Sequence, residues 1–134
     1  MQDSDKRHDM NNIQPSILRL DTATEYYFGE GCYIIELLNS EDDPALSIAR
    51  ARVAGGKSTR WHRLADTVER YQILSGCGQV EVGDLPATAV NPGDTVVIPA
   101  GVRQRIHNHG HEDLIFLALC TPRFLAGNYQ DLEA

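Results

Sequence analysis

Short apolar-rich stretches separated by turn-forming residues run through the chain from about residue 16 onward. Turn sequences such as GDLP, NPGD and PAG come between them, and no stretch has the period of an amphipathic helix. About ten strands are predicted, at residues 16–20, 32–38, 46–53, 58–63, 67–75, 79–83, 88–90, 95–98, 102–108 and 113–120. Many short strands with frequent turns predict an all-β barrel or sandwich, with one helical turn after Thr121.

The segment 56–76, GKSTRWHRLADTVERYQILSG, predicts how several polar side chains are arranged. STRWHR and TVERYQILS alternate polar and apolar residues around a short LAD turn, so we expect a β-hairpin with one half-buried face. Because side chains alternate along a strand, Arg60 and His62 share a face, and Glu69 and Tyr71 join them across the hairpin. In an arbitrary β protein such a His–Glu pair is more often a structural cross-strand pair, so both interpretations stand at this point.

Composition indicates one domain. The chain has 134 residues, of which 42% are apolar, enough for a single core. We expect one domain over residues 16–134, preceded by a polar, flexible arm at residues 1–15. The formal net charge of −7 disfavours nucleic acid and anionic membrane as partners and favours small molecules or proteins. Because no signal-peptide pattern or membrane-spanning apolar run is found, a cytoplasmic location is expected.

The three cysteines, Cys32, Cys77 and Cys120, are odd in number and lack CxxC spacing. A disulfide framework or a thiolate zinc site is therefore not expected, and reduced thiols are predicted. Cys77, between two glycines, is predicted to be exposed in a turn, whereas Cys120 ends an apolar run and is predicted to be buried.

Alternation also relates His107, His109 and His111, which on one strand would place three imidazoles on the same side. Asn108 and Gly110 between them indicate a turn, so a solvated loop is predicted. These three histidines are not counted as metal ligands.

Two groups of residues resemble the two sequence motifs of the cupin superfamily. Glycine, histidine and glutamate positions define the first motif, and glycine, proline, histidine and asparagine positions define the second. Eight residues fall on the motif spacings, namely Gly56, His62, Glu69, Gly76, Gly93, Pro99, Gly101 and Asn108. The resemblance covers about residues 46–124 and implies a small single-domain cupin of the conserved-barrel type. The implied fold is a double-stranded β-helix, or jelly-roll barrel, in which 56–76 and 93–108 form facing hairpins.

The cupin ligand set is incomplete in this chain. Cupins with a full metal site use two His and the Glu of the first motif and the His of the second, and here Leu64 and Gln104 replace two of those histidines. The resemblance implies His62, Glu69 and the amide oxygen of Gln104 as candidate ligands for one divalent metal ion, with Fe, Mn, Ni and Zn not distinguished. Because a neutral amide is a weak donor, the sequence leaves open whether a metal binds.

Without a metal, the same positions predict a polar pocket. The alternation of side chains places Gln104 inward beside His62, Glu69 and Tyr71. His62 would then act as a general base oriented by Glu69, with Tyr71 as the acid, which is the chemistry of an isomerase or epimerase.

Arg60, Gln104 and Arg123 are candidate substrate-binding residues. Arg60 could hold an anionic substrate on the inward face, and Arg123 follows a strand, where it could close the mouth of the pocket. A solvated or paired surface side chain is the alternative for each arginine.

The strand at 113–120, DLIFLALC, is apolar on both faces, which predicts cover by the core on one side and by a second sheet or subunit on the other. The resemblance to small cupins also implies a homodimer. Three functions stay open: a metal-dependent oxygenase, isomerase or lyase acting on a small metabolite, a metal-free isomerase or epimerase, and a non-catalytic ligand-binding or sensor module. The sequence does not decide whether the protein is an enzyme, because this fold hosts many chemistries.

Overall fold

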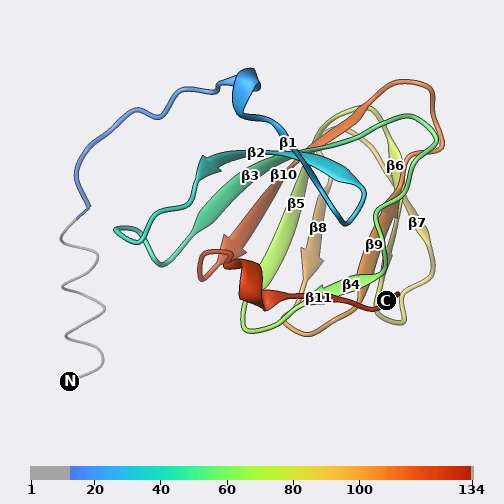
Figure 1. Cartoon of the computed structure of the whole chain (residues 1–134). Helices are drawn as coiled ribbons and strands as arrows, with labels where there is room; N and C mark the ends of the chain where they lie inside the picture. Colours follow the sequence, from blue (N-terminus) through green and yellow to red (C-terminus); the bar gives the residue numbers. More distant parts are fainter. Residues whose placement is uncertain (1–12, 134) are drawn as a thin grey trace.

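The computed structural model describes residues 13–133, so most of the predicted arm at 1–15 lies outside the described residues. Within residues 13–133, eleven strands form two antiparallel sheets that face each other (Figure 1). Two short 3-10 helices, Thr22–Thr24 (η1) and Ala126–Asn128 (η2), are the only helical segments in this range. The predicted all-β, double-stranded β-helix fold is therefore confirmed.

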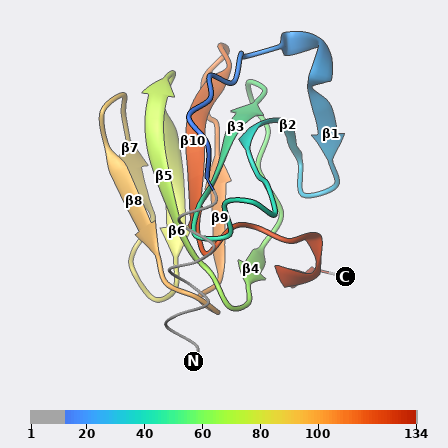
Figure 2. The same ribbon diagram turned by 90° about the vertical axis from the view of Figure 1, so that its left-hand side faces the viewer.

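The two sheets share a barrel interior. The six-stranded sheet has the order β1 (Tyr26–Phe28), β2 (Cys32–Leu38), β3 (Ser47–Val53), β10 (Leu114–Thr121), β5 (Val68–Ser75) and β8 (Thr95–Ile98). The five-stranded sheet has the order β11 (Tyr129–Asp131), β4 (His62–Leu64), β9 (Gln104–His107), β6 (Gly78–Val82) and β7 (Thr88–Val90). Figure 2 shows the six-stranded sheet in front, with β4, β6 and β9 behind it.

Most predicted strands are present, and three differences stand out. Residues 16–20 are exposed and form no strand, because no neighbouring strand pairs with their backbone. The short strands β1 and β11 were not predicted from the sequence. Both are three residues long, too short to display an alternating pattern, and they are stabilised by pairing with β2 and β4.

The predicted hairpin at 56–76 is wrong. β4 pairs with β9 and β11, whereas β5 pairs with β10 and β8, so the chain crosses from one sheet to the other at residues 65–67. The predicted hairpin at 93–108 is wrong for the same reason, because β8 pairs with β5 and β9 pairs with β6 and β4. Alternation fixes which face a side chain occupies but not which strand lies beside it.

Apolar side chains from the two sheets meet in the barrel. Ile73 and Phe116 project inward from the six-stranded sheet, and Val82 and Ile106 project inward from the five-stranded sheet. The buried row alternates with exposed or half-buried neighbours, as a sheet with one covered face requires. No helix among the described residues has the length and apolar character needed to cross a membrane.

Two of the cysteine predictions are confirmed by the structure. Cys120 is buried and Cys77 is exposed, and these two thiols, together with that of the buried Cys32, are free. Cys120 faces the inside of the barrel from β10, where it takes part in the lining of a cavity.

Candidate functional site

A cavity of about 60 Å³ lies between the two sheets, with room for a few water-sized groups at about 10–15 Å³ each. Its polar lining consists of Tyr26, Glu30, Glu36, Ser47, His62, Glu69, Tyr71, Cys120 and Tyr129. Its apolar lining consists of Ile34, Ala49, Ala51, Leu64, Phe116, Ala118 and Phe124. The two strands that the sequence did not predict, β1 and β11, supply Tyr26 and Tyr129 to this wall.

His62 is the only imidazole in the cavity wall, and its side chain is 2% exposed. Its Nδ1 atom lies 2.6 Å from the backbone oxygen of Arg60. A carbonyl oxygen only accepts, so Nδ1 carries a proton and Nε2 is the nitrogen left to exchange protons with other groups. The ring stacks on Tyr129, with 5.1 Å between the ring centroids, which holds the imidazole plane in place.

Glu30 lies opposite this nitrogen, and the sequence analysis did not identify it. Its Oε2 atom is 3.1 Å from His62 Nε2, a distance at which the two atoms can share one proton. The thiol of Cys32 donates a hydrogen bond to the other carboxylate oxygen at 2.9 Å. Burial, followed by the charge of Glu30, raises the pKa of Cys32, so this thiol remains a protonated donor.

The turn between β1 and β2 positions Glu30. The amide of Gly31 donates to the backbone oxygen of Phe28 at 3.0 Å, which closes a tight turn around Glu30. Gly31 has a φ of 106°, and an added Cβ would lie 2.7 Å from the backbone oxygen of Ser58. Only glycine fits this turn without moving the chain. The GEG sequence at 29–31 was a detectable turn signal, but its neighbour β1 was not predicted, so no strand pair pointed to the cavity.

A second polar group lies deeper in the barrel, on facing strands. The Glu69 carboxylate accepts a hydrogen bond from Gln104 Nε2 at 2.8 Å, and the Gln104 carbonyl oxygen accepts one from the Tyr71 hydroxyl. Burial, followed by the charge of Glu30, raises the pKa of Glu69 to about 8. Burial also raises the pKa of Tyr71 well above its ordinary range. At neutral pH Glu69 therefore holds its proton in the native state.

The cavity wall is acidic. Three carboxyl groups line it, those of Glu30, Glu36 and Glu69, and no lysine or arginine does so among residues 13–133. The hydroxyl of Tyr129 is buried and has no hydrogen-bond partner in this part of the chain. A buried hydroxyl without a partner costs free energy, so a polar group bound beside Tyr129 would recover a hydrogen bond.

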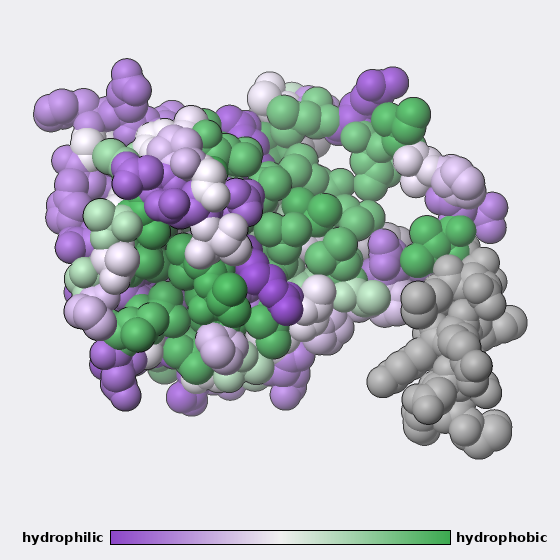
Figure 3. All heavy atoms as spheres, turned by 180° about the vertical axis from the view of Figure 1, so that it is seen from behind, coloured by the Kyte–Doolittle hydropathy of each residue, from purple (hydrophilic) through white to green (hydrophobic). Residues whose placement is uncertain are grey.

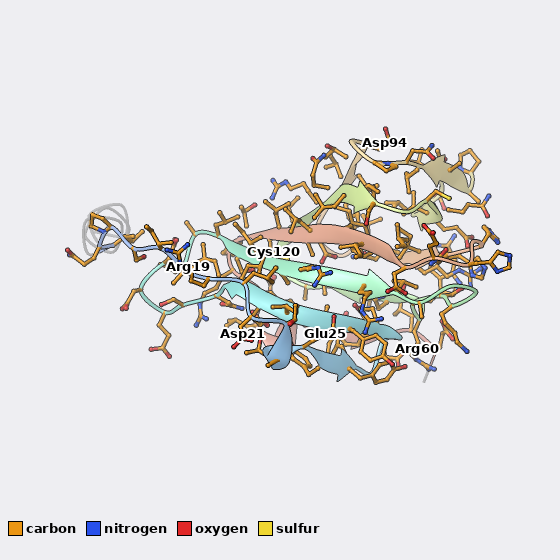
Figure 4. All side chains as sticks on the ribbon, turned by 90° about the horizontal axis from the view of Figure 1, so that it is seen from above. Arg19, Asp21, Glu25, Arg60, Asp94 and Cys120 are labelled. Carbon is orange, nitrogen blue, oxygen red and sulfur yellow. The ribbon has the colours of Figure 1, made fainter. Side chains whose placement is uncertain are left out.

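The structure brings together only part of the predicted site. His62, Glu69 and Tyr71 line the cavity, whereas Gln104 is fully buried behind them and does not reach its surface. Arg60 points outward, where its guanidinium pairs with Asp131 at 3.0 Å. In Figure 4 Arg60 lies at the edge of the molecule, away from Cys120 in the cavity wall.

Arg123 also lies away from the cavity lining. Its guanidinium donates to the Asn39 side chain at 2.9 Å, and its backbone amide donates to the Pro44 oxygen. The side chain therefore fixes the end of β10 against the loop between β2 and β3 and does not line the cavity.

The predicted metal ligands do not fit a metal ion as the structure arranges them. The amide oxygen of Gln104 is occupied by the Tyr71 hydroxyl, and the Glu69 carboxyl holds a proton that a metal ligand would have to lose. Within residues 13–133, no three or more His, Cys, Asp or Glu side chains are grouped so that they could hold a metal ion. His107 and His109 lie on the outer surface, with 4.0 Å between their ring centroids, and His111 is exposed.

Comparison with known proteins identifies the family. The family described as "Cupin domain" matches residues 49–120, more than half of the chain. An uncharacterized protein of Methanocaldococcus jannaschii is 31% identical over 115 residues, which cover 84% of this chain and 89% of that protein. The chain therefore belongs to the cupin family.

Two solved structures show the same fold. One, from Thermotoga maritima and described as a predicted oxalate decarboxylase, has a TM-score of 0.71 at 24% identity and covers 80% of this chain and 99% of its own. The other, KdgF from Halomonas sp., has a TM-score of 0.71 at 17% identity and covers 81% of this chain and 96% of its own. At these identities the likeness extends to the fold, and function must be argued from the site.

Proposed function

We propose that this cupin is an enzyme of the isomerase or epimerase type, which moves a proton on a small metabolite bound in the barrel. The observation that carries the proposal is the 3.1 Å contact between His62 Nε2 and Glu30 Oε2 at the cavity wall. An imidazole whose other nitrogen is fixed by a backbone carbonyl presents one nitrogen for proton transfer. The fold alone would leave the function open, so the proposal rests on these residues.

Each polar residue has a distinct role in this proposal. His62 takes a proton from the substrate, and Glu30 stabilises the imidazolium that forms. Glu69 holds a proton in the native state and donates it to a substrate oxygen or carbon on the opposite side. Tyr71, suggested as the acid by the sequence, is held in its hydrogen bond to Gln104 and is a positioning residue.

The charge of the cavity limits the substrate. With three carboxyl groups and no basic side chain in the wall, an uncharged or positively charged ligand is favoured over an anion. Oxalate, named in the description of the Thermotoga neighbour, carries two negative charges and would find no opposing charge here. Decarboxylation of oxalate is therefore not proposed for this chain.

A deuterium-exchange experiment tests the proposal. A panel of small sugars, polyols, amines and carboxylates would first be sorted by thermal shift, and the ligands that bind would then be incubated with enzyme in D₂O and followed by ¹H NMR. The wild type is expected to bind uncharged or cationic compounds and to exchange a carbon-bound hydrogen. Glu30→Gln and His62→Asn are expected to lose exchange, and Trp61→Phe, altered on the outer surface, is expected to retain it.

The same experiment separates the other two hypotheses from the proposal. Binding without deuterium incorporation would instead support a ligand-binding or sensor module. Activity that is lost on dialysis against a chelator and restored by Fe, Mn, Ni or Zn would support a metal-dependent enzyme. Exchange that persists in His62→Asn would overturn the assignment of the base.

A further inference from the structure

The segment before β1, residues 13–20, forms an extended arm that stands clear of the barrel. Figure 1 shows it leaving η1 and arching away from the strands. Its four large apolar side chains are exposed: Ile13 by 42%, Ile17 by 77%, Leu18 by 60% and Leu20 by 56%. Four such side chains within eight residues are far more apolar surface than an isolated arm can expose at no cost.

The arm lies in front of the outer face of the six-stranded sheet, as Figure 2 shows. On that face β10 presents Ile115, Leu117 and Leu119, which are only half-buried. Leu119 lies in register between Ile48 of β3 and Arg70 of β5, so apolar side chains continue across neighbouring strands. Figure 3 shows hydrophobic residues on both sides of the space between the arm and the barrel.

The two surfaces are complementary in charge as well as in polarity. The arm and the β2–β3 loop form a concave surface that includes Ile13, Leu18, Asp42 and Asp43. The outer face of the sheet carries Arg50 and Arg70, neither of which has a carboxylate partner within 4.0 Å among residues 13–133. An acidic, apolar hollow and a basic, apolar face therefore occur on the same chain.

We propose that the arm at residues 13–20 packs across the outer face of the six-stranded sheet of a second copy of the chain. The two copies form a twofold dimer in which each arm covers its partner. This proposal concerns assembly and is independent of the chemistry proposed for the cavity. Because both complementary surfaces belong to one chain, a twofold arrangement buries both pairs at once, which a different partner protein would not do.

The dimensions agree with this arrangement. Eight extended residues span up to about 26–29 Å. Six strands spaced by about 4.8 Å give a sheet about 24 Å wide between its outer strands. One arm can therefore cross the whole sheet and bring its apolar side chains over β10, while Asp42 and Asp43 approach the basic side chains of the partner's sheet.

Sedimentation velocity of the full chain, at 1–100 µM, tests the proposal. The wild type is expected to sediment at twice the monomer mass of 14.9 kDa. The arm variant Ile17→Asp/Leu18→Asp and the face variant Leu117→Asp are each expected to weaken the dimer by ~100-fold or more and to sediment as monomers. The matched control Leu85→Asp, which alters a 69% exposed leucine near β6, is expected to remain dimeric.

Mixing distinguishes arm exchange from a dimer that uses these residues in another way. The arm variant keeps an intact sheet face, and the face variant keeps an intact arm, so a mixture restores one correct contact. Native mass spectrometry, with one variant ¹⁵N-labelled, is expected to detect a mixed dimer although each variant alone is monomeric. Circular dichroism establishes that the variants are folded, and if Leu117→Asp fails to fold, Ile48→Asp replaces it.

Three results would overturn the proposal. A wild type that stays monomeric at 100 µM would show that the arm does not join two copies. A dimer that survives both the arm and the face variants would place the interface elsewhere. Absence of mixed dimers, with both variants folded and monomeric alone, would exclude the exchange of arms.

Discussion

Replacement of Glu69 by Gln is expected to remove a pH-dependent loss of stability. Burial, followed by the charge of Glu30, raises the pKa of the Glu69 carboxyl from 4.5 to about 8 in the folded protein. Between these two pH values the native state keeps a proton that the unfolded state has lost. The native state therefore binds more protons, and the free energy of unfolding of the wild type falls as pH rises through this window.

The magnitude follows from the number of protons. One proton bound only in the native state gives a slope of at most ~1.4 kcal/mol per pH unit, so the upper limit is ~4 kcal/mol between pH 5 and pH 8. Glu69→Gln preserves the shape of the side chain and an oxygen that accepts from Gln104, but does not titrate. The stability of the variant relative to the wild type is therefore expected to increase steadily from pH 5 to pH 8.

Urea unfolding at pH 5, 6, 7 and 8, followed by circular dichroism, measures this difference. Glu41→Gln, made in the exposed loop between β2 and β3, is the matched control for removal of one carboxyl group from the surface. A difference between Glu69→Gln and the wild type that stays constant over the whole range would refute the argument. A difference that shrinks with rising pH would mean that the folded protein holds Glu69 as a carboxylate.

Two further predictions concern the groups that hold the site in place. Tyr71→Phe removes the hydroxyl that donates to Gln104, so a buried carbonyl loses its partner, and urea unfolding is expected to show a loss of ~1–3 kcal/mol; no measurable loss would mean that water replaces the hydroxyl. Gly31→Ala forces a Cβ to within 2.7 Å of the Ser58 oxygen at a φ of 106°, so a loss of ~1–2 kcal/mol is expected together with weaker ligand binding, whereas Gly127→Ala, with open space around it, is expected to change neither.

The separation of charge between the inside and the outside of the barrel follows from strand alternation. On β9, Gln104 and Ile106 face inward, whereas Arg105 faces outward, where it pairs with Glu81 at 2.7 Å and stacks on Trp61 at 4.4 Å from the ring centroid. Basic side chains of this strand are therefore held on the surface. The cavity keeps its carboxyl groups without a compensating cation, which is the basis of the substrate preference proposed above.

The sequence by itself determined the all-β fold and the direction of individual side chains. Alternation along a strand is a local property, and it predicted that His62, Glu69, Tyr71 and Gln104 turn away from solvent. Cys120 was likewise predicted to be buried from the apolar run that it ends. These conclusions needed no knowledge of which strands are neighbours.

The tertiary structure decided which strands pair and which side chains meet. Strand pairing depends on hydrogen bonds between residues far apart in the chain, so the adjacent strands β4 and β5 could enter opposite sheets although their spacing resembled a hairpin. Only this arrangement brings Glu30, 32 residues before His62 in the sequence, to within 3.1 Å of its imidazole. Side-chain partners are equally non-local: Asp131 draws Arg60 outward, and Tyr71 binds the amide oxygen of Gln104, because hydrogen bonding and ion pairing depend on distance in space rather than on position in the sequence.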